Sequence, residues 1–181
     1  METSGHQYSQ DPLKITYARM LLVYDSISLV RELDAGLGFS VFIDLGHTRL
    51  LFDTGSDGEI LISNLKRMGI DPQSIQFVFI SHNRAGHIGG LDDLLKQNPK
   101  IPVYLPRSFP TNKITAIQNA GTEVKLISET EEIRPLVFSL GEFVGNFREQ
   151  ALAFNTSEGV VVVTGCAHEG IFSIFETVGK V

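Results

Sequence analysis

The sequence predicts a single α/β domain, and three observations lead to this prediction. Apolar runs of strand length alternate with amphipathic helical segments through the middle of the chain. Extended segments separated by short turns lie on both sides of that middle region. The chain of 181 residues is long enough for one sizeable hydrophobic core and short for two. We therefore expect one domain over residues 14–181, preceded by a polar, disordered leader over residues 1–13.

The domain is expected to begin with extended structure. Residues 14–23 are rich in apolar side chains, and residues 39–44 and 48–52 form two further apolar runs. Only a short turn that contains His47 separates the last two runs. This spacing predicts an antiparallel hairpin with an exposed His47 at its turn.

A helix is expected next, over about residues 57–68. Ser56 and Glu59 have the spacing of a capping box at its start, and Gly69 follows its end. One helical face carries apolar side chains at intervals of four and three residues, namely Leu61, Leu65 and Met68.

The middle of the chain continues as strand, helix, strand, helix and strand. We expect a strand over residues 77–80, a short helix around residues 91–95 and a strand over residues 102–105. A helix over residues 112–119 and a strand over residues 124–127 follow. Nothing in this region marks a linker, so the pattern supports one α/β domain.

The last third of the chain shifts to extended segments. Residues 150–155 and 160–164 are apolar runs separated by turn residues, which predicts a second hairpin. Residues 170–178 have the pattern of a helix that opens after this hairpin.

The composition excludes several classes of function. A net charge of −6 argues against nonspecific binding to nucleic acid or to an anionic membrane, which needs a basic patch. No apolar segment approaches the ~20 residues that span a bilayer. The single cysteine, Cys166, excludes an internal disulfide and fits a reducing compartment. We therefore expect a cytoplasmic protein with a small-molecule partner and with neither a nucleic-acid nor a membrane partner.

Polar side chains follow three of the expected strands. Asp53 follows the first hairpin, His82 and His87 follow the strand over residues 77–80, and His168 follows the second hairpin. Binding groups of α/β proteins collect just beyond strand ends, so these four residues are expected to share one pocket. A lone histidine is more often a structural residue, but catalytic zinc typically uses three protein ligands and imidazole is its commonest one. Three histidines in one pocket would suffice for one ion.

The same segments carry a family resemblance. The segment Leu-Leu-Phe-Asp-Thr-Gly ends at residue 55, Ser81-His82 precedes His-Ile-Gly-Gly-Leu at residues 87–91, and Thr-Gly-Cys-Ala-His ends at residue 168. In order and separation they resemble the metallo-β-lactamase superfamily over about residues 14–176. The Glu-Gln-Ala-Leu stretch at residues 149–152 is similar to the metal-dependent hydrolases related to an enzyme of methanopterin biosynthesis. The resemblance implies an αββα sandwich, truncated here at the C-terminus.

The resemblance also implies a site with two metal ions, held by the pattern H-x-H-x-D-H and by later histidines. His82 and His168 would then bind one ion, His87 would bind the other, and Asp53 would brace the histidine loop. This chain departs from the pattern at two positions, because Arg84 replaces its middle histidine and Gly86 replaces its aspartate. Arginine stays protonated and offers no lone pair to a metal ion, and glycine offers no side chain.

These departures leave two hypotheses. The first is a hydrolase-like protein of weak activity that holds at most one ion, zinc or a similar divalent metal, on His82, His87 and His168. The second is a metal-free, non-catalytic relative that binds an anionic small molecule or a protein partner through Arg84, whose guanidinium fork suits carboxylate or phosphate. For Arg84 itself there is also a simpler alternative, in which its side chain is exposed to solvent or pairs with a nearby acid.

Three further expectations concern single features. Cys166 is expected as a buried thiol beneath the pocket and not as a nucleophile paired with His168. Ser81 and Thr164 are expected to make hydrogen bonds at strand ends. A truncated last layer would leave an apolar face uncovered, which predicts a homodimer.

Overall fold

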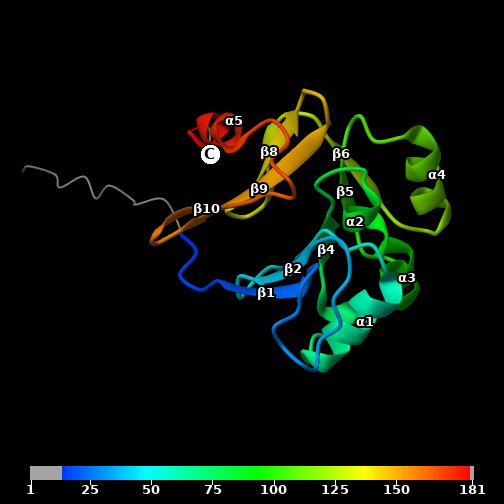
Figure 1. Ribbon diagram of the computed structural model, residues 1–181. Coiled ribbons are helices and arrows are strands. Elements are labelled where there is room, and N and C mark those ends of the chain that lie inside the picture. The colour runs from blue at the N-terminus through cyan, green and yellow to red at the C-terminus, as the bar shows by residue number, and fades with distance from the viewer. Residues whose placement is uncertain (1–13, 180–181) are drawn as a thin grey trace, which may run out of the picture.

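The computed structural model describes residues 14–179, which form four layers in the order helix, sheet, sheet, helix (Figure 1). The first sheet is mixed: its first three strands are antiparallel, and its third to sixth strands are parallel. Its strands, in spatial order, are β1 (Arg19–Tyr24), β2 (Ser40–Asp44), β3 (Arg49–Phe52), β4 (Phe77–Phe79), β5 (Val103–Pro106) and β6 (Val124–Ile127). The expected first hairpin is confirmed as β2 and β3, and His47 is exposed at its turn.

The second sheet is antiparallel throughout and contains the expected second hairpin. Its strands, in spatial order, are β10 (Gly159–Val163), β9 (Glu149–Thr156), β8 (Val137–Phe143) and β7 (Thr130–Arg134). Helix α5 (Ile171–Val178) packs on this sheet. The other helical elements lie on the first sheet's side, and they are α1 (Gly58–Arg67), the 3-10 turn η1 (Pro72–Ser74), α2 (Ala85–Ile88), α3 (Leu91–Gln97) and α4 (Thr111–Asn119). The αββα sandwich is therefore confirmed.

Alternation along the strands builds one core between each pair of layers. In β3, Leu51 packs toward the helices with Leu61 of α1, whereas Phe52 packs between the two sheets. In β9, Phe154 faces the space between the sheets and Ala153 faces α5. Successive side chains of one strand thus serve two different cores, as expected for a sheet that is covered on both faces.

One local prediction needs correction, and one strand was not predicted. The N-cap of α1 is Asp57, whose side chain accepts hydrogen bonds from the backbone N–H groups of Glu59 and Ile60. Ser56 does not cap the helix, because its hydroxyl group pairs with the hydroxyl group of Tyr24 at 3.0 Å. The edge strand β7 was not predicted, because its polar sequence Thr-Glu-Glu-Ile-Arg lacks an apolar run.

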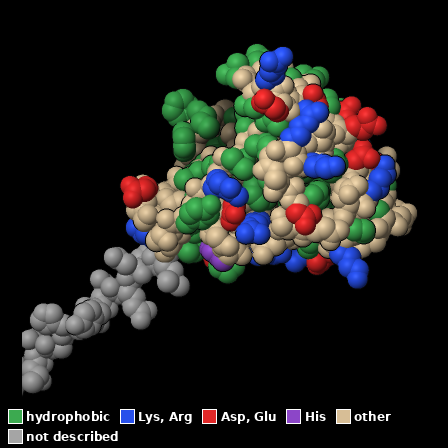
Figure 2. Space-filling view, turned by 90° about the horizontal axis from the view of Figure 1, so that it is seen from below, with side chains coloured by type: hydrophobic (Ala, Val, Ile, Leu, Met, Phe, Trp, Pro, Cys, Tyr) green, Lys and Arg blue, Asp and Glu red, His purple; other side chains and the backbone are tan. Residues whose placement is uncertain are grey.

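The surface features of the described residues do not test the expected partners, which stay predictions. On the face in Figure 2, Lys and Arg side chains lie among Asp and Glu side chains and do not gather into one basic patch. Among residues 14–179, no helix has the length and apolarity of a membrane span. Helix α5 exposes Phe172 and Phe175, so light scattering remains the direct test of the expected homodimer. The leader expected over residues 1–13 lies outside the described residues.

Candidate metal centre

Three loops converge at one edge of the sandwich. Asp53 follows β3, and His82 follows the parallel neighbour β4, so both leave the sheet at the same edge. The second sheet joins this edge directly, because Gln150 of β9 donates its backbone N–H to the carbonyl oxygen of Ser81 at 2.8 Å. The loop between β10 and α5 brings Cys166 to the same place. The predicted convergence of strand ends is therefore present.

Asp53 is the anchor of the site. It is completely buried, and it has a positive φ of 57° at the end of β3, a conformation that is uncommon for residues other than glycine. One carboxylate oxygen accepts the backbone N–H of Ser81 at 2.7 Å. The other oxygen accepts the Ser81 hydroxyl and the Nδ1 of His87, each at 2.7 Å. Burial raises the pKa of Asp53, although its hydrogen bonds to His87 and Ser81 oppose the shift.

This network fixes the orientation of both histidines in the loop. The Ser81 hydroxyl donates its one hydrogen bond to Asp53. Its oxygen therefore accepts a hydrogen bond from Nδ1 of His82 at 2.9 Å. With Nδ1 as the donor in both rings, the lone pairs of His82 and His87 lie on their Nε2 atoms, and that of His87 faces the Cys166 thiol. Burial, together with the charges of His87, His168 and Arg84, lowers the pKa of His82 to about 3. His82 is therefore neutral at physiological pH, which is the form that binds metals.

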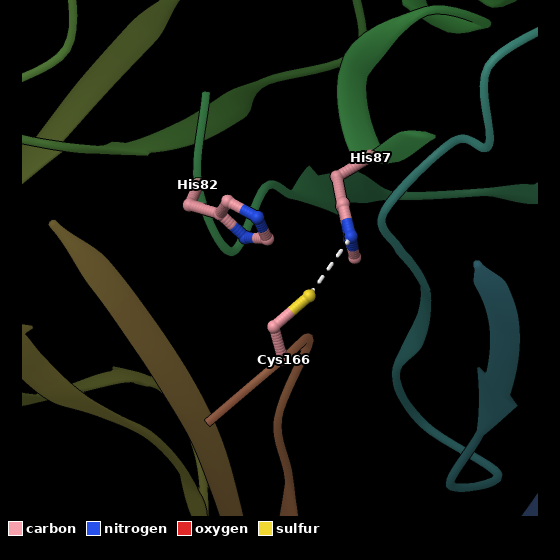
Figure 3. A group of neighbouring side chains, drawn as sticks. All are labelled: His82, His87 and Cys166. Carbon is pink, nitrogen blue, oxygen red and sulfur yellow. Dashed lines mark hydrogen bonds between the residues drawn. The ribbon is translucent and has the colours of Figure 1, made fainter. Parts of the chain in front are cut away.

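Figure 3 shows the side chains of His82, His87 and Cys166 converging. Their donor atoms all lie within 4.8 Å of one another, and the Cys166 Sγ lies 3.3 Å from Nε2 of His87. Ligand atoms around one tetrahedral zinc ion lie roughly 3.3–3.7 Å apart, given Zn–N and Zn–S bonds of about 2.1 and 2.3 Å. Two imidazoles and a thiol also form a donor set that zinc accepts. The donor atoms of His82, His87 and Cys166 would therefore fit around a single zinc ion if the distances between them shortened slightly.

The position of Cys166 corrects a prediction. The residue is exposed and its thiol lies against His87, so the expected buried thiol beneath the pocket was wrong. Partial desolvation raises the pKa of the Cys166 thiol, the charge of Glu149 adds to the rise, and Arg84 opposes it. The thiol is thus protonated at neutral pH without a metal ion, and metal binding would release that proton.

His168, the third predicted ligand, lies beside this group and not within it. Its ring centroid is 5.2 Å from that of His82 and 4.5 Å from that of Phe147. Its Nε2 atom is buried without a hydrogen-bond partner in the described part of the chain. His168 therefore belongs to the same pocket, with a ring nitrogen still available.

The two replaced motif positions have distinct surroundings. Gly86 packs against Gly38, and a Cβ atom at position 86 would lie 3.1 Å from the Cα of Gly38. The carbonyl oxygen of Gly86 also accepts the backbone N–H of Phe39 at 3.0 Å. Arg84 is exposed, stacks over Phe147 at 4.0 Å, and forms no salt bridge with a carboxylate of residues 14–179.

A cleft of about 250 Å³ lies next to His82. Two guanidinium groups line it, those of Arg84 and Arg148, and Ser108 and Asn146 add polar groups. Arg148 has only a distant acidic partner, because its guanidinium lies 3.9 Å from Glu142. The cleft therefore offers positive charge and hydrogen-bond donors directly beside His82.

An αββα sandwich with histidine-bearing loops at the shared edge of its sheets defines this chain as a protein of the metallo-β-lactamase-like fold class. Residues 33–171 match the metallo-beta-lactamase superfamily. The chain belongs to this superfamily.

One curated relative is the 7,8-dihydropterin-6-methyl-4-(beta-D-ribofuranosyl)-aminobenzene-5′-phosphate synthase of Methanocaldococcus jannaschii, with 29% identity over 77% of this chain. This relative confirms the resemblance to the methanopterin-related branch, but the chain spans only 63% of its length.

Solved structures confirm the fold. A quorum-quenching N-acyl homoserine lactone lactonase matches with a TM-score of 0.61 and 15% identity, over 94% of this chain and 87% of its own. The metallo-beta-lactamase fold protein YhfI from Bacillus subtilis matches with a TM-score of 0.63 and 14% identity, over 82% of this chain and 63% of its own. At these identities the likeness concerns the fold alone.

Proposed function

We propose that this protein is a hydrolase-like metalloprotein that holds one divalent ion, zinc or a similar metal. The observation that carries the proposal is the convergence of three donor atoms, on His82, His87 and Cys166, within 4.8 Å of one another. His168 provides a further ring nitrogen beside them. Because Arg84 and Gly86 remove two side chains from the superfamily's dinuclear pattern, we propose one ion and not two.

Each residue around the proposed ion would have a separate role. Asp53 accepts a hydrogen bond from the Nδ1–H group of His87 and so directs the Nε2 lone pair of this ring toward the ion. Ser81 does the same for His82. A bound zinc ion would lower the pKa of a water molecule toward ~7 and polarise a substrate oxygen. Arg84 and Arg148 would bind an anionic group of the substrate in the adjacent cleft.

Metal content tests this proposal. Purified protein incubated with Zn²⁺ and then dialysed should retain one equivalent, measured by inductively coupled plasma mass spectrometry. His82→Ala should weaken zinc binding by at least about 100-fold, since loss of a supporting group alone costs 10–100-fold. The control is His47→Ala, which changes an exposed histidine at the β2–β3 turn. Two equivalents in the wild type would contradict the mononuclear site, and a fully folded wild type that retains no zinc would favour the second candidate function.

The second candidate is a non-catalytic protein that binds an anionic small molecule through the cleft. Two observations favour it, namely the two guanidinium groups in the cleft and the absence of a carboxylate partner for Arg84 among residues 14–179. The archaeal relative is named for a phosphate-bearing compound, which is compatible with this ligand class. We propose phosphate or carboxylate as the recognised group in either function.

Arg84→Ala should weaken the binding of inorganic phosphate about tenfold, because a hydrogen bond to a charged group contributes about 1.5 kcal/mol or more. Isothermal titration calorimetry in the presence of a chelator measures this affinity without a contribution from metal. The control is Arg19→Ala, which removes an exposed arginine that pairs with Asp44. Unchanged phosphate binding by Arg84→Ala would reject the anion site.

A further inference from the structure

Glu149 is a buried acid that neither function explains. It is the first residue of β9 and only 1% exposed. Neither carboxyl oxygen has a hydrogen-bond partner in the described part of the chain. The neighbouring Arg148 does not neutralise it, because its nearest carboxylate is that of Glu142. A buried acid without a partner is unfavourable, so its position requires an explanation.

The backbone places Glu149 at the metal centre. Glu149 and His82 form an isolated antiparallel bridge, and directly opposed residues have Cβ atoms about 5 Å apart on the same face. The next residue, Gln150, faces the opposite way, since its amide group donates hydrogen bonds to the carbonyl oxygens of Ile80 and Tyr104 between the sheets. The side chain of Glu149 therefore leaves β9 on the face that carries His82.

Glu149 is not alone in lacking a partner there. Within residues 14–179, the other buried side-chain atoms without a hydrogen bond are Nε2 of His82, Nε2 of His168 and Oγ1 of Thr164. Thr164 was expected to form a hydrogen bond at the strand end, and its hydroxyl does not. His82 and His168 have rings 5.2 Å apart. The bridge and the ring contact bring Glu149, His82 and His168 together, and their unpaired oxygen and nitrogen atoms match the requirements of a cation and its bound water.

Charge balance points in the same direction. An imidazole that binds a metal ion is a neutral ligand, so among His82, His87 and Cys166 only the Cys166 thiolate would offset the charge of a divalent ion. Arg84 adds a positive charge that acts on His82. The superfamily pattern has an aspartate at the position of Gly86, so one negative charge is missing there.

We propose that Glu149 is the acidic group of this metal centre and supplies the negative charge that Gly86 does not. The inference rests on the proposed binding of one metal ion. It adds a residue that lies outside the histidine motif and reaches the site from the second sheet.

The test uses Co²⁺ alone as the probe, with the wild type and Glu149→Gln, which keeps the shape and removes the charge. Glu149→Gln should bind Co²⁺ at least tenfold more weakly by isothermal titration calorimetry. In the presence of a chelator, Glu149→Gln should melt about 2–4 °C above the wild type, because a buried acid without a partner is removed. When Co²⁺ is saturating, the difference between the two melting temperatures should become smaller, or the wild type should melt at the higher temperature.

Glu142→Gln is the matched control. Glu142 is a half-buried acid of the adjacent strand β8 whose carboxylate accepts hydrogen bonds from Ser108. Its replacement should lower the melting temperature of the metal-free protein and leave Co²⁺ affinity unchanged. Equal Co²⁺ affinities for wild type and Glu149→Gln overturn the role of Glu149 alone. A wild type that binds no Co²⁺ overturns the proposed metal function and this inference together.

Discussion

Replacing Asp53 with alanine is expected to destabilise the protein by about 3 kcal/mol or more, because buried donors left without an acceptor cost ~1–3 kcal/mol each. Asp53 accepts three hydrogen bonds from Ser81 and His87, and alanine can accept none of them. Alanine must also adopt the positive φ that Asp53 has. Urea denaturation of the metal-free protein measures the loss of free energy of unfolding.

Asp53→Asn separates the structural role of this residue from its effect on the metal site. Asparagine tolerates the same backbone conformation and keeps one acceptor oxygen, so part of the stability should return, although its amide N–H groups must face donors that the carboxylate accepted from. Zinc affinity should still fall 10–100-fold, since the amide supports the tautomer of His87 less well than a carboxylate does. An Asp53→Asn variant that binds zinc as tightly as the wild type would contradict the orienting role.

Replacing Cys166 with serine is expected to weaken zinc binding by at least about 100-fold, because it removes a thiolate ligand, whereas loss of a supporting group already costs 10–100-fold. Serine is nearly isosteric, so the fold should be retained. The Co²⁺-loaded wild type should show the near-ultraviolet absorption of a thiolate-to-cobalt transition, and Cys166→Ser should lack it. This spectrum reports the ligand directly and does not depend on any enzymatic activity.

His168→Ala decides between the two candidate sets of ligands. If Cys166 is the third ligand, His168→Ala should retain the thiolate absorption and most of the affinity. If the set predicted from the sequence is correct, His168→Ala should abolish binding and Cys166→Ser should not. The second pattern would remove Cys166 from the site and restore His82, His87 and His168 as the donors.

Most of the fold could be predicted from the sequence, because its elements carry strong local signals. The alternation of strands and amphipathic helices, the two hairpins and the position of α1 are all present in the structure. Strand β7 was missed, since it is an edge strand held by pairing with β8 and not by an apolar run of its own. The cap of α1 was placed one residue early, because Ser56 and Asp57 are both good N-caps and Ser56 is engaged by Tyr24.

The candidate site was harder to predict, because half of it depends on contacts between distant segments. Asp53, His82 and His87 follow strand ends in the first sheet, and their positions could be inferred from that alone. Cys166 was misjudged, since a thiol has no local signal that distinguishes packing from metal binding. Glu149 was not identified, because only the bridge between His82 and the start of β9 places it beside the histidines.

The contact between Gly38 and Gly86 limits which side chains the histidine loop can carry. A side chain at position 86 would press on the backbone of Gly38, and one at position 38 would meet the carbonyl oxygen of Gly86. The two glycines therefore let these backbone segments approach each other closely at the edge of the histidine loop. An aspartate at position 86 would require the backbone of Gly38 to move by a few tenths of an ångström, so a restored carboxylate would also shift the segment that precedes β2.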